Sequence, residues 1–355
     1  MKLSTNALIG ALLLPAILAG IGALALWAWH ANVTAPRYEP AYSPVPAGLA
    51  ASPKLDYAIS GVITSGLVEA KWLCFEAPDR IWVGSDRAAV GLDLDGRVQA
   101  RMALPAGVRA MSADPERGCY YVALTDRVAV VKAGGEKGAE WISPGARTLL
   151  TALAGDDRFI YAADAGQRVV WQFDKTTGEL LIRLGLRDPA HDIPGFIIPS
   201  PYFSLAMAPD GLLRVVNPGR HSIEAYTADG QLEQRWGKAS WDVDGFVGCC
   251  NPSYLAILGD GRFVTSEKGL RRIKVYDAQG QFEALVATPA QLASGPVDPE
   301  SENEPCPILV DSRPDVEGGT EDGCRRDDRI WALIPETGLI RVFKRADGRR
   351  SGVRL

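Results

Sequence analysis

Residues 158–185 read RFIYAADAGQRVVWQFDKTTGELLIRLG and contain the pattern that decides the fold. The apolar stretch FIYAAD precedes a short loop, the alternating stretch RVVWQFD, a turn with glycine and a last strand, ELLIRLG. Glycine in such turns allows the positive φ angles that tight hairpins need. The same order returns in 211–237 (GLLRVVNPGRHSIEAYTADGQLEQRWG) and in 261–287 (GRFVTSEKGLRRIKVYDAQGQFEALVA). We therefore interpret the chain as a series of similar antiparallel strand units.

Six such units follow one another, and each predicts four short strands. One four-stranded sheet cannot bury both of its faces, whereas sheets repeated around an axis cover each other and leave only short edges. A period of about 40–50 residues with four strands is typical of propeller blades. The sequence thus predicts an all-β fold, a six-bladed β-propeller with four-stranded antiparallel blades. The units begin near residues 70, 108, 147, 201, 250 and 306, and the turns before their outer strands carry Gly96, Gly138, Gly178, Gly230, Gly280 and Gly348.

The segment 55–66 (LDYAISGVITSG) is left over before the first unit. Because the tail RRSGVRL is a poor strand former, we expect this segment to supply the outer strand of the last blade and so to close the ring.

The units resemble NHL repeats, in which an apolar strand, a DG turn, V-x-D and a small loop precede R-[VI]-x-[VK]-[FY] and a second DG turn. Residues 158–185 fit this pattern best, and Asn217 and Glu267 replace the aspartate in two other units. The resemblance covers roughly residues 70–355 and extends to exported bacterial NHL-repeat proteins of unassigned function. It implies the propeller fold. It says little about activity, because such propellers serve as enzymes, binding modules and scaffolds.

The N-terminal part predicts a membrane anchor. Ala7 to Trp29 is an uncharged apolar run, about 34 Å long as a helix and thus long enough for a bilayer core. We divide the chain into a transmembrane signal anchor (1–30), a Pro/Ala-rich tether (31–54) and the propeller (55–355) with an acidic insertion (297–329). With Lys2 on the cytoplasmic side, the propeller is expected outside the cytoplasm, at the periplasmic face of the inner membrane if the cell is Gram-negative. The alternative is secretion after cleavage of a signal peptide.

Charge and composition limit the partners. A formal net charge of −5 lacks the electrostatic footprint of a nucleic-acid-binding protein, so no nucleic-acid partner is expected. The 37 glycines and 24 prolines favour a turn-rich β protein over a helix bundle. The membrane, through the N-terminal helix, is the first expected partner, and a protein or a small ligand on the loops is the second.

The candidate site follows from propeller geometry. Loops that link one blade to the next, and loops between the second and third strands, lie on one face around the channel mouth. Polar and titratable residues of this sequence gather in those loops, and the candidate ligand-binding residues are His191, Asp192, Tyr202, Arg220, His221, Cys249, Cys250, Asn251 and Lys268. Asp164, Asn217 and Glu267 occupy equivalent positions in successive units and are the candidates for a divalent-metal site.

Six cysteines in an exported chain suggest disulfides. We expect a bridge between Cys306 and Cys324 across the acidic insertion, and buried thiols at Cys74 and Cys119. The adjacent Cys249 and Cys250 leave three alternatives: a strained vicinal bridge, separate structural roles, or ligation of a soft metal. Separate roles are favoured if the pair lies in a strand, where adjacent side chains point to opposite faces.

Two functional hypotheses remain. The first is a membrane-tethered extracytoplasmic propeller that acts as a binding or scaffold module for a protein or a small ligand. The second is a propeller enzyme or redox component, metal- or quinone-dependent and similar to lactonases, lyases or dehydrogenases, with its site at the channel mouth. The sequence contains no GxSxG, P-loop or zinc-ligand spacing, so it does not decide whether the chain is an enzyme.

Overall fold

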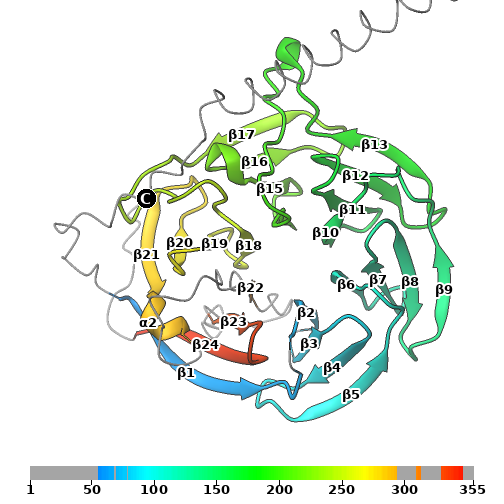
Figure 1. Cartoon of the computed structure of the whole chain (residues 1–355), viewed down its shortest axis with the longest axis horizontal. Coiled ribbons are helices and arrows are strands. Elements are labelled where there is room, and N and C mark those ends of the chain that lie inside the picture. Colours follow the sequence, from blue (N-terminus) through cyan, green and yellow to red (C-terminus); the bar gives the residue numbers. More distant parts are fainter. Residues whose placement is uncertain (1–54, 68, 78, 294–308, 313–328, 347–355) are drawn as a thin grey trace, which may run out of the picture. The chain divides into compact units, whose positions relative to one another are not determined.

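The computed structural model describes residues 55–67, 69–77, 79–293, 309–312 and 329–346. Their strands form six four-stranded antiparallel sheets arranged as a ring (Figure 1), so the predicted six-bladed β-propeller is confirmed. Within a blade, strands that follow each other in the chain are hydrogen-bonded neighbours, as the turn pattern predicts. We name the blades A to F in chain order.

The strands of the first three blades are β2 (Trp72–Ala77), β3 (Arg80–Gly84), β4 (Ala88–Leu92) and β5 (Val98–Ala103) in blade A; β6 (Ala110–Asp114), β7 (Cys119–Ala123), β8 (Val128–Lys132) and β9 (Lys137–Glu140) in blade B; and β10 (Leu150–Gly155), β11 (Phe159–Asp164), β12 (Val169–Asp174) and β13 (Leu180–Leu184) in blade C.

The remaining blades contain β14 (Leu205–Met207), β15 (Leu213–Asn217), β16 (Ser222–Tyr226) and β17 (Leu232–Trp236) in blade D; β18 (Tyr254–Ile257), β19 (Phe263–Ser266), β20 (Ile273–Tyr276) and β21 (Phe282–Ala287) in blade E; and β22 (Leu309–Ser312), β23 (Ile330–Ile334), β24 (Leu339–Arg345) and β1 (Tyr57–Thr64) in blade F. Among the described residues, three short helices lie in loops: η1 (Pro189–His191), η2 (Pro218–Arg220) and α2 (Pro289–Leu292).

The ring closes as predicted from the leftover segment. Strand β1 pairs antiparallel with β24, from Tyr57 opposite Arg345 to Thr64 opposite Leu339, and becomes the outer strand of blade F (Figure 1). Inner strands pack beside one another all the way round, with β22 next to β2. At that seam the Phe75 amide donates to Asp311 Oδ2 at 3.1 Å.

A repeated contact joins neighbouring blades on the outside. In blades A to E, the glycine in the turn before the outer strand contacts a large side chain from the preceding blade. Gly178 has a φ of +73°, and a Cβ there would lie 2.4 Å from the Trp141 ring; a Cβ at Gly280 would lie equally close to Trp236. Both the backbone angle and the close packing therefore require glycine. In blade B the glycine with positive φ is Gly135, so the expected turn position at Gly138 was wrong by three residues.

The hydrophobic core lies between the blades, where strands of adjacent sheets face each other. One cluster joins Trp82 of blade A, Tyr120 of blade B and Trp331 of blade F, each at most 3% exposed. Apolar packing across three blades gives the ring most of its stability, because burial scales with the apolar area removed from water.

Several predictions concern residues outside the described part of the chain. The expected anchor (1–30), the tether (31–54) and the Cys306–Cys324 bridge lie there. Within the described part, no helix has the length and apolar character needed to cross a membrane. Residues 309–312 of the predicted acidic insertion form β22, the inner strand of blade F.

Closure through β1 is open to a direct test. Ile63 is 6% exposed and packs on Gly96 of blade A, whereas Val62 on the same strand is 59% exposed. Ile63→Ala is expected to lower the free energy of unfolding by about 2–4 kcal/mol, because it opens a cavity at the seam. Val62→Ala should change it by less than about 1 kcal/mol. Denaturant unfolding of the two variants measures this, and equal losses would contradict a seam sealed by Ile63.

Candidate functional site

Among the links between blades whose residues the structure describes throughout, two on one face of the ring are much longer than the others. Residues 185–204 join blade C to blade D, and residues 237–253 join blade D to blade E, whereas 104–109 and 141–149 suffice for the earlier links. By strand alternation, these linking loops share a face with the turns between the second and third strands of each blade. We call this the loop face. The predicted site residues belong to it.

The predicted metal candidates hold these loops to the blades. Asp164, Asn217 and Glu267 end the second strands of blades C, D and E or directly follow them, and all three are fully buried. Each accepts a hydrogen bond from a backbone amide of the preceding linking loop, at distances of 2.9, 2.9 and 3.1 Å; the donors are Leu149, Ile197 and Val247 respectively.

Each of these three residues also has a partner seven positions later, on the third strand. Asp164 accepts from the Trp171 indole, Asn217 donates to Glu224, and Glu267 pairs with Lys274, each at 2.8 Å. We call them the anchor pairs. Their chemistry differs from blade to blade, but each joins a donor to an acceptor. A buried polar group left without a partner costs free energy, so each change at one position requires a matching change at the other.

The predicted metal candidates are all engaged in the anchor pairs. Asp164, Asn217 and Glu267 lie in three different blades, and their side chains are already hydrogen-bonded. Among the described residues, no three His, Cys, Asp or Glu side chains form a group that could hold a metal ion. Each side chain is therefore already used within its own blade and linking loop, and the metal site stays a prediction.

Blade E has the most charged anchor pair. Glu267 binds Lys274 through Oε1 at 2.8 Å and Arg272 through Oε2 at 3.0 Å, and Lys274 is fully buried. The Lys274 ammonium also donates to the Gly245 carbonyl at 2.6 Å and lies 4.4 Å from the centre of the Phe246 ring. Burial lowers the pKa of Lys274 to about 8, against the opposing effect of Glu267.

Three further candidates, Arg220, His221 and Asn251, also form hydrogen bonds that hold the backbone of the loops. Arg220 donates to the carbonyls of Gly195 and Pro194 at 3.1 and 2.9 Å, so it fastens the first long loop to η2. The His221 ring, through Nε2, hydrogen-bonds the Gly248 carbonyl of the second long loop.

Asn251 is 2% exposed and ties its own loop to the next turn. Its amide oxygen accepts from the Lys268 backbone at 2.7 Å, and its nitrogen donates to the Lys268 carbonyl at 3.0 Å. A ligand would have to break these bonds to reach the Asn251 side chain. We therefore assign Asn251 a structural use in the folded loop.

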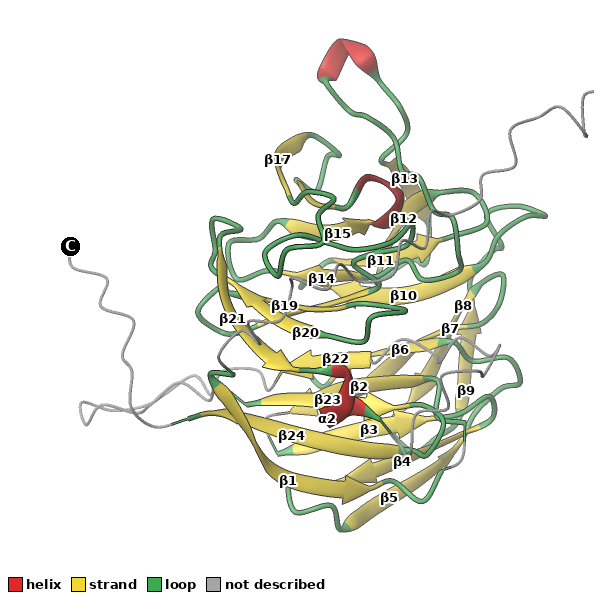
Figure 2. Cartoon of the chain, turned by 60° about the vertical axis from the view of Figure 1, so that its left-hand side comes forward, coloured by secondary structure: helices red, strands yellow, loops and turns green. Residues whose placement is uncertain are grey.

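His191 and Asp192 lie away from the other candidates. They lie at the protruding tip of the first long loop, where η1 projects beyond the ring of sheets (Figures 1 and 2). His191 Nδ1 lies 2.7 Å from Asp188 Oδ2, and both side chains are exposed. This contact lowers the pKa of Asp188 and, with the Asp188 bond to the Ala190 amide, fixes the loop tip locally.

Four candidates do come together between blades D and E. The Tyr202 ring stands edge-on to Tyr254, with centroids 6.2 Å apart, and the Lys268 ammonium lies 5.5 Å from the centre of the Tyr202 ring. Cys249 and Cys250 belong to the adjoining turn, and their sulfurs are 3.0 Å apart. The predicted gathering of Tyr202, Lys268 and the two cysteines stands, together with Tyr254, which sequence analysis missed.

Sequence analysis also missed the apolar residues of the long loops. Leu186 and Ile197 of the first loop are 42% and 43% exposed, and Trp241 of the second is 37% exposed. A tryptophan between polar loop residues, as in SWDVDG, indicates an exposed aromatic side chain. This pattern could have predicted the exposure of Trp241.

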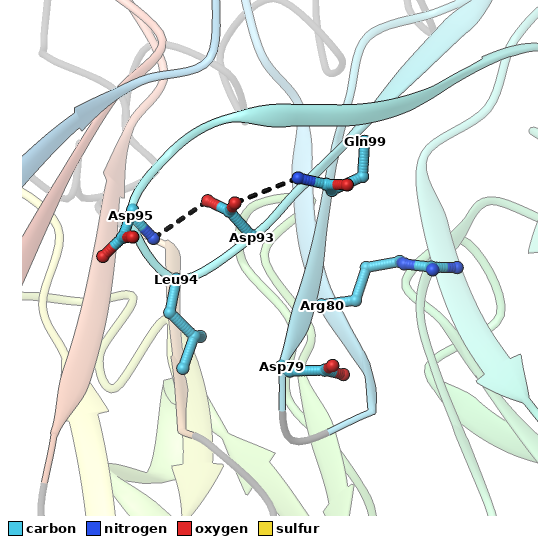
Figure 3. A pocket seen from close by; sticks show the side chains of 6 residues that line it. All are labelled: Asp79, Arg80, Asp93, Leu94, Asp95 and Gln99. Atoms are coloured by element: carbon cyan, nitrogen blue, oxygen red, sulfur yellow. Dashed lines mark hydrogen bonds between the residues drawn. The ribbon is translucent and has the colours of Figure 1, made fainter.

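A hollow of about 380 Å³ lies on the opposite face of blade A (Figure 3). It lies at the β2–β3 and β4–β5 turns, and its lining residues are Asp79, Arg80, Asp93, Leu94, Asp95 and Gln99. The Asp93 carboxylate accepts from the backbone amides of Asp95 and Arg97 and from the Gln99 side chain (Figure 3), and these hydrogen bonds hold its pKa below the usual range. Asp93 thus shapes its own turn, and we assign the hollow no function.

The ring of six four-stranded sheets defines the class of this protein as a six-bladed β-propeller. No protein-family model matches the chain, and no curated protein matches its sequence. The NHL resemblance therefore stays a prediction.

Solved structures share the fold. A catalytically inactive variant of virginiamycin B lyase from Staphylococcus aureus with quinupristin aligns with a TM-score of 0.52 and 14% identity, over 78% of this chain and 81% of the lyase. A streptogramin B lyase aligns with a TM-score of 0.51 and 12% identity, over 82% and 88%. A protein of unknown function from Bacteroides thetaiotaomicron aligns with a TM-score of 0.54 and 15% identity, over 82% and 72%. At these identities the likeness establishes the fold alone.

The buried lysine gives a test by pH. The folded chain binds the Lys274 proton less tightly than the unfolded chain, whose lysines titrate near 10.4. Raising the pH from about 7.5 to 9.5 therefore removes a cost of the folded state, and the contribution of Lys274 to the free energy of unfolding should rise by roughly 1–2 kcal/mol.

The measurement is the difference in unfolding free energy between the unmodified chain and Lys274→Met across this pH range. Lys238→Met is the matched control, because Lys238 is exposed in the second long loop, whose Gly245 carbonyl Lys274 binds, and Asp244 raises the pKa of Lys238. The difference in unfolding free energy between the unmodified chain and Lys238→Met should stay constant across this pH range. A Lys274→Met difference that is equally flat, or that falls with pH, would show that burial does not depress this lysine.

Proposed function

We propose that the chain is a membrane-tethered, extracytoplasmic binding module whose loop face holds a partner protein. The observation that carries this is the pair of long linking loops, which are fastened to their blades and still expose Leu186, Ile197 and Trp241. Fixed loops lose little conformational entropy when they bind, so their exposed apolar groups contribute fully to affinity.

The chemistry of the exposed groups favours a protein over a small ligand. Tryptophan and tyrosine are the residues that most often dominate protein interfaces, and Trp241 and Tyr202 belong to the two long loops. The polar side chains of the loop face are largely used internally, as the bonds of Asn217, Asn251 and Arg220 illustrate. A small-ligand site would instead require several convergent polar groups with unused hydrogen-bonding capacity.

Two finer assignments belong to the same proposal. The blades are NHL-type repeats, as R-[VI]-x-[VK]-[FY] patterns such as RIKVY support. The N-terminal run from Ala7 to Trp29 is the membrane anchor, since its length and lack of charge suit a bilayer core. The enzyme hypothesis stays a prediction without a supporting observation in the loop face.

The binding surface can be tested by photo-crosslinking of the full chain in the cells that produce it. A photoreactive amino acid at Trp241 or Ile197 should yield a discrete adduct of higher mass, because both side chains face solvent on the loop face. The matched control is the same amino acid at Asp95, on the opposite face of blade A. The absence of adducts at both loop positions, or equal adducts at Asp95, would contradict this surface.

The membrane tether makes a separate prediction. The mature chain should retain residues 1–30, stay in the membrane pellet after alkaline extraction, and become sensitive to external protease once the outer permeability barrier is opened. Mass analysis of the purified chain measures the first point. A mature N-terminus that begins close to Ala25 would favour a cleaved signal peptide and a released propeller.

A further inference from the structure

The two adjacent cysteines lie in a turn, where their side chains converge. Residues 248–250 form the bend before β18, and the sulfurs of Cys249 and Cys250 are 3.0 Å apart. In a strand the two side chains would point to opposite faces, which was the reason to expect separate roles. Cys74 and Cys119 lie in β2 and β7, and all four thiols are unbridged. The reason to expect separate roles, a strand at residues 249–250, therefore does not hold.

The turn is held on every side by hydrogen bonds from other parts of the chain. The Val247 amide donates to Glu267 at 3.1 Å, and the Gly248 carbonyl is bonded by the His221 ring. After the cysteines, the Ser253 hydroxyl donates to the Cys250 carbonyl at 3.1 Å, and Asn251 is tied to Lys268. Because the backbone on both sides is fixed, the two sulfurs stay near each other. A disulfide of about 2.05 Å would require them to approach by roughly 1 Å.

The two thiols differ in access. Cys249 is exposed, whereas Cys250 is 8% exposed. Burial raises the pKa of Cys250, and the neighbouring Ser200 and Lys268 oppose part of that effect. An external reagent therefore reacts first with the exposed Cys249. The buried Cys250 sulfur lies 3.0 Å from the Cys249 sulfur and can react with it next. This is the arrangement of an attacking and a resolving cysteine.

We propose that Cys249 and Cys250 form a thiol–disulfide exchange site on the loop face, with an external disulfide as oxidant. The Cys249 thiolate attacks one sulfur of the disulfide RSSR, which forms a mixed disulfide and releases one RS⁻. The Cys250 thiolate then attacks the Cys249 sulfur, which forms the Cys249–Cys250 bond and releases the second RS⁻. The two thiol protons pass to the released thiolates, so two protein thiols are oxidised while RSSR is reduced to two thiols.

The site would change the loop face without a large movement. Closing the eight-membered ring removes two hydrogen-bonding thiols beside Tyr202 and Lys268, while the bonds that hold Val247, Gly248 and Asn251 can persist. The external thiol–disulfide ratio would thereby set the fraction of molecules that carry the Cys249–Cys250 bond at the surface between blades D and E. The inference concerns the chemistry of the cysteines and stands apart from the proposed protein partner.

The test is equilibration of the full chain with reduced and oxidised glutathione at a series of ratios, followed by acid quenching and peptide mass mapping. The peptide with residues 249 and 250 should lose two hydrogens reversibly as the buffer becomes more oxidising. Cys250→Ser should instead accumulate a glutathione adduct on Cys249, at least about tenfold above the unmodified chain, because the intramolecular second step is missing. Cys249→Ser should accumulate little adduct, since Cys250 is buried.

Cys119→Ser is the matched control, because this half-buried thiol lies in β7 and should leave the exchange unchanged. Peptide mapping keeps the result separate from any reaction of Cys306 and Cys324. The proposal is overturned if the unmodified chain shows no two-hydrogen loss in this peptide, if either cysteine pairs with a different one, or if adduct persists equally in the unmodified chain and in Cys250→Ser.

Discussion

The structure depends on the pairing of β1 with β24. Five of the six blades are built from consecutive strands, but the sixth takes its outer strand from the start of the described chain. Without that strand, β24 would present a free edge and the seam between β22 and β2 would have no outer support. Every residue discussed on the loop face is positioned relative to this closed ring, because distant loops share a face only when the blades meet.

The anchor pairs explain how the long loops are held in place. A loop of about 17 to 20 residues without regular structure is costly to order. In blades C, D and E, a buried side chain at the end of the second strand accepts a hydrogen bond from an amide of the incoming loop, and a partner on the third strand completes its hydrogen bonding. Blade E does this with Glu267 and Lys274, an ion pair that is expensive to bury and strongly destabilising to break. The anchors therefore link the position of each loop to the integrity of its blade.

The fold was predictable from the sequence, and most of the site was not, for a physical reason. Strand alternation and turn glycines are local signals, so six blades, their starting points and the closing strand could be predicted. Whether a polar loop residue binds a ligand or its own backbone depends on contacts between segments far apart in the chain. Asp164 and Asn217 illustrate this, because their partners Leu149 and Ile197 belong to linking loops whose path the sequence does not predict.

A signal for the anchors was nevertheless present. Asp164 with Trp171, Asn217 with Glu224, and Glu267 with Lys274 share a seven-residue spacing and complementary hydrogen-bonding groups. A metal site would place like ligands at one position and would not require a changing partner at a second. For the cysteine pair no such signal existed, since GFVGCCNPS suits a turn or a strand equally.

The distribution of loop length around the ring carries a last implication. A structural ring needs only the short links found between blades A, B and C, so the longer loops of blades C to E add cost without adding closure. The chain fixes them with buried hydrogen bonds and still leaves Trp241, Ile197 and the thiol of Cys249 at their surface. Exposed apolar groups on ordered loops reduce solubility unless a partner covers them. The length of these two loops and their exposed apolar groups are thus a physical reason to place recognition over blades D and E, beside Cys249 and Cys250, whose sulfurs lie 3.0 Å apart.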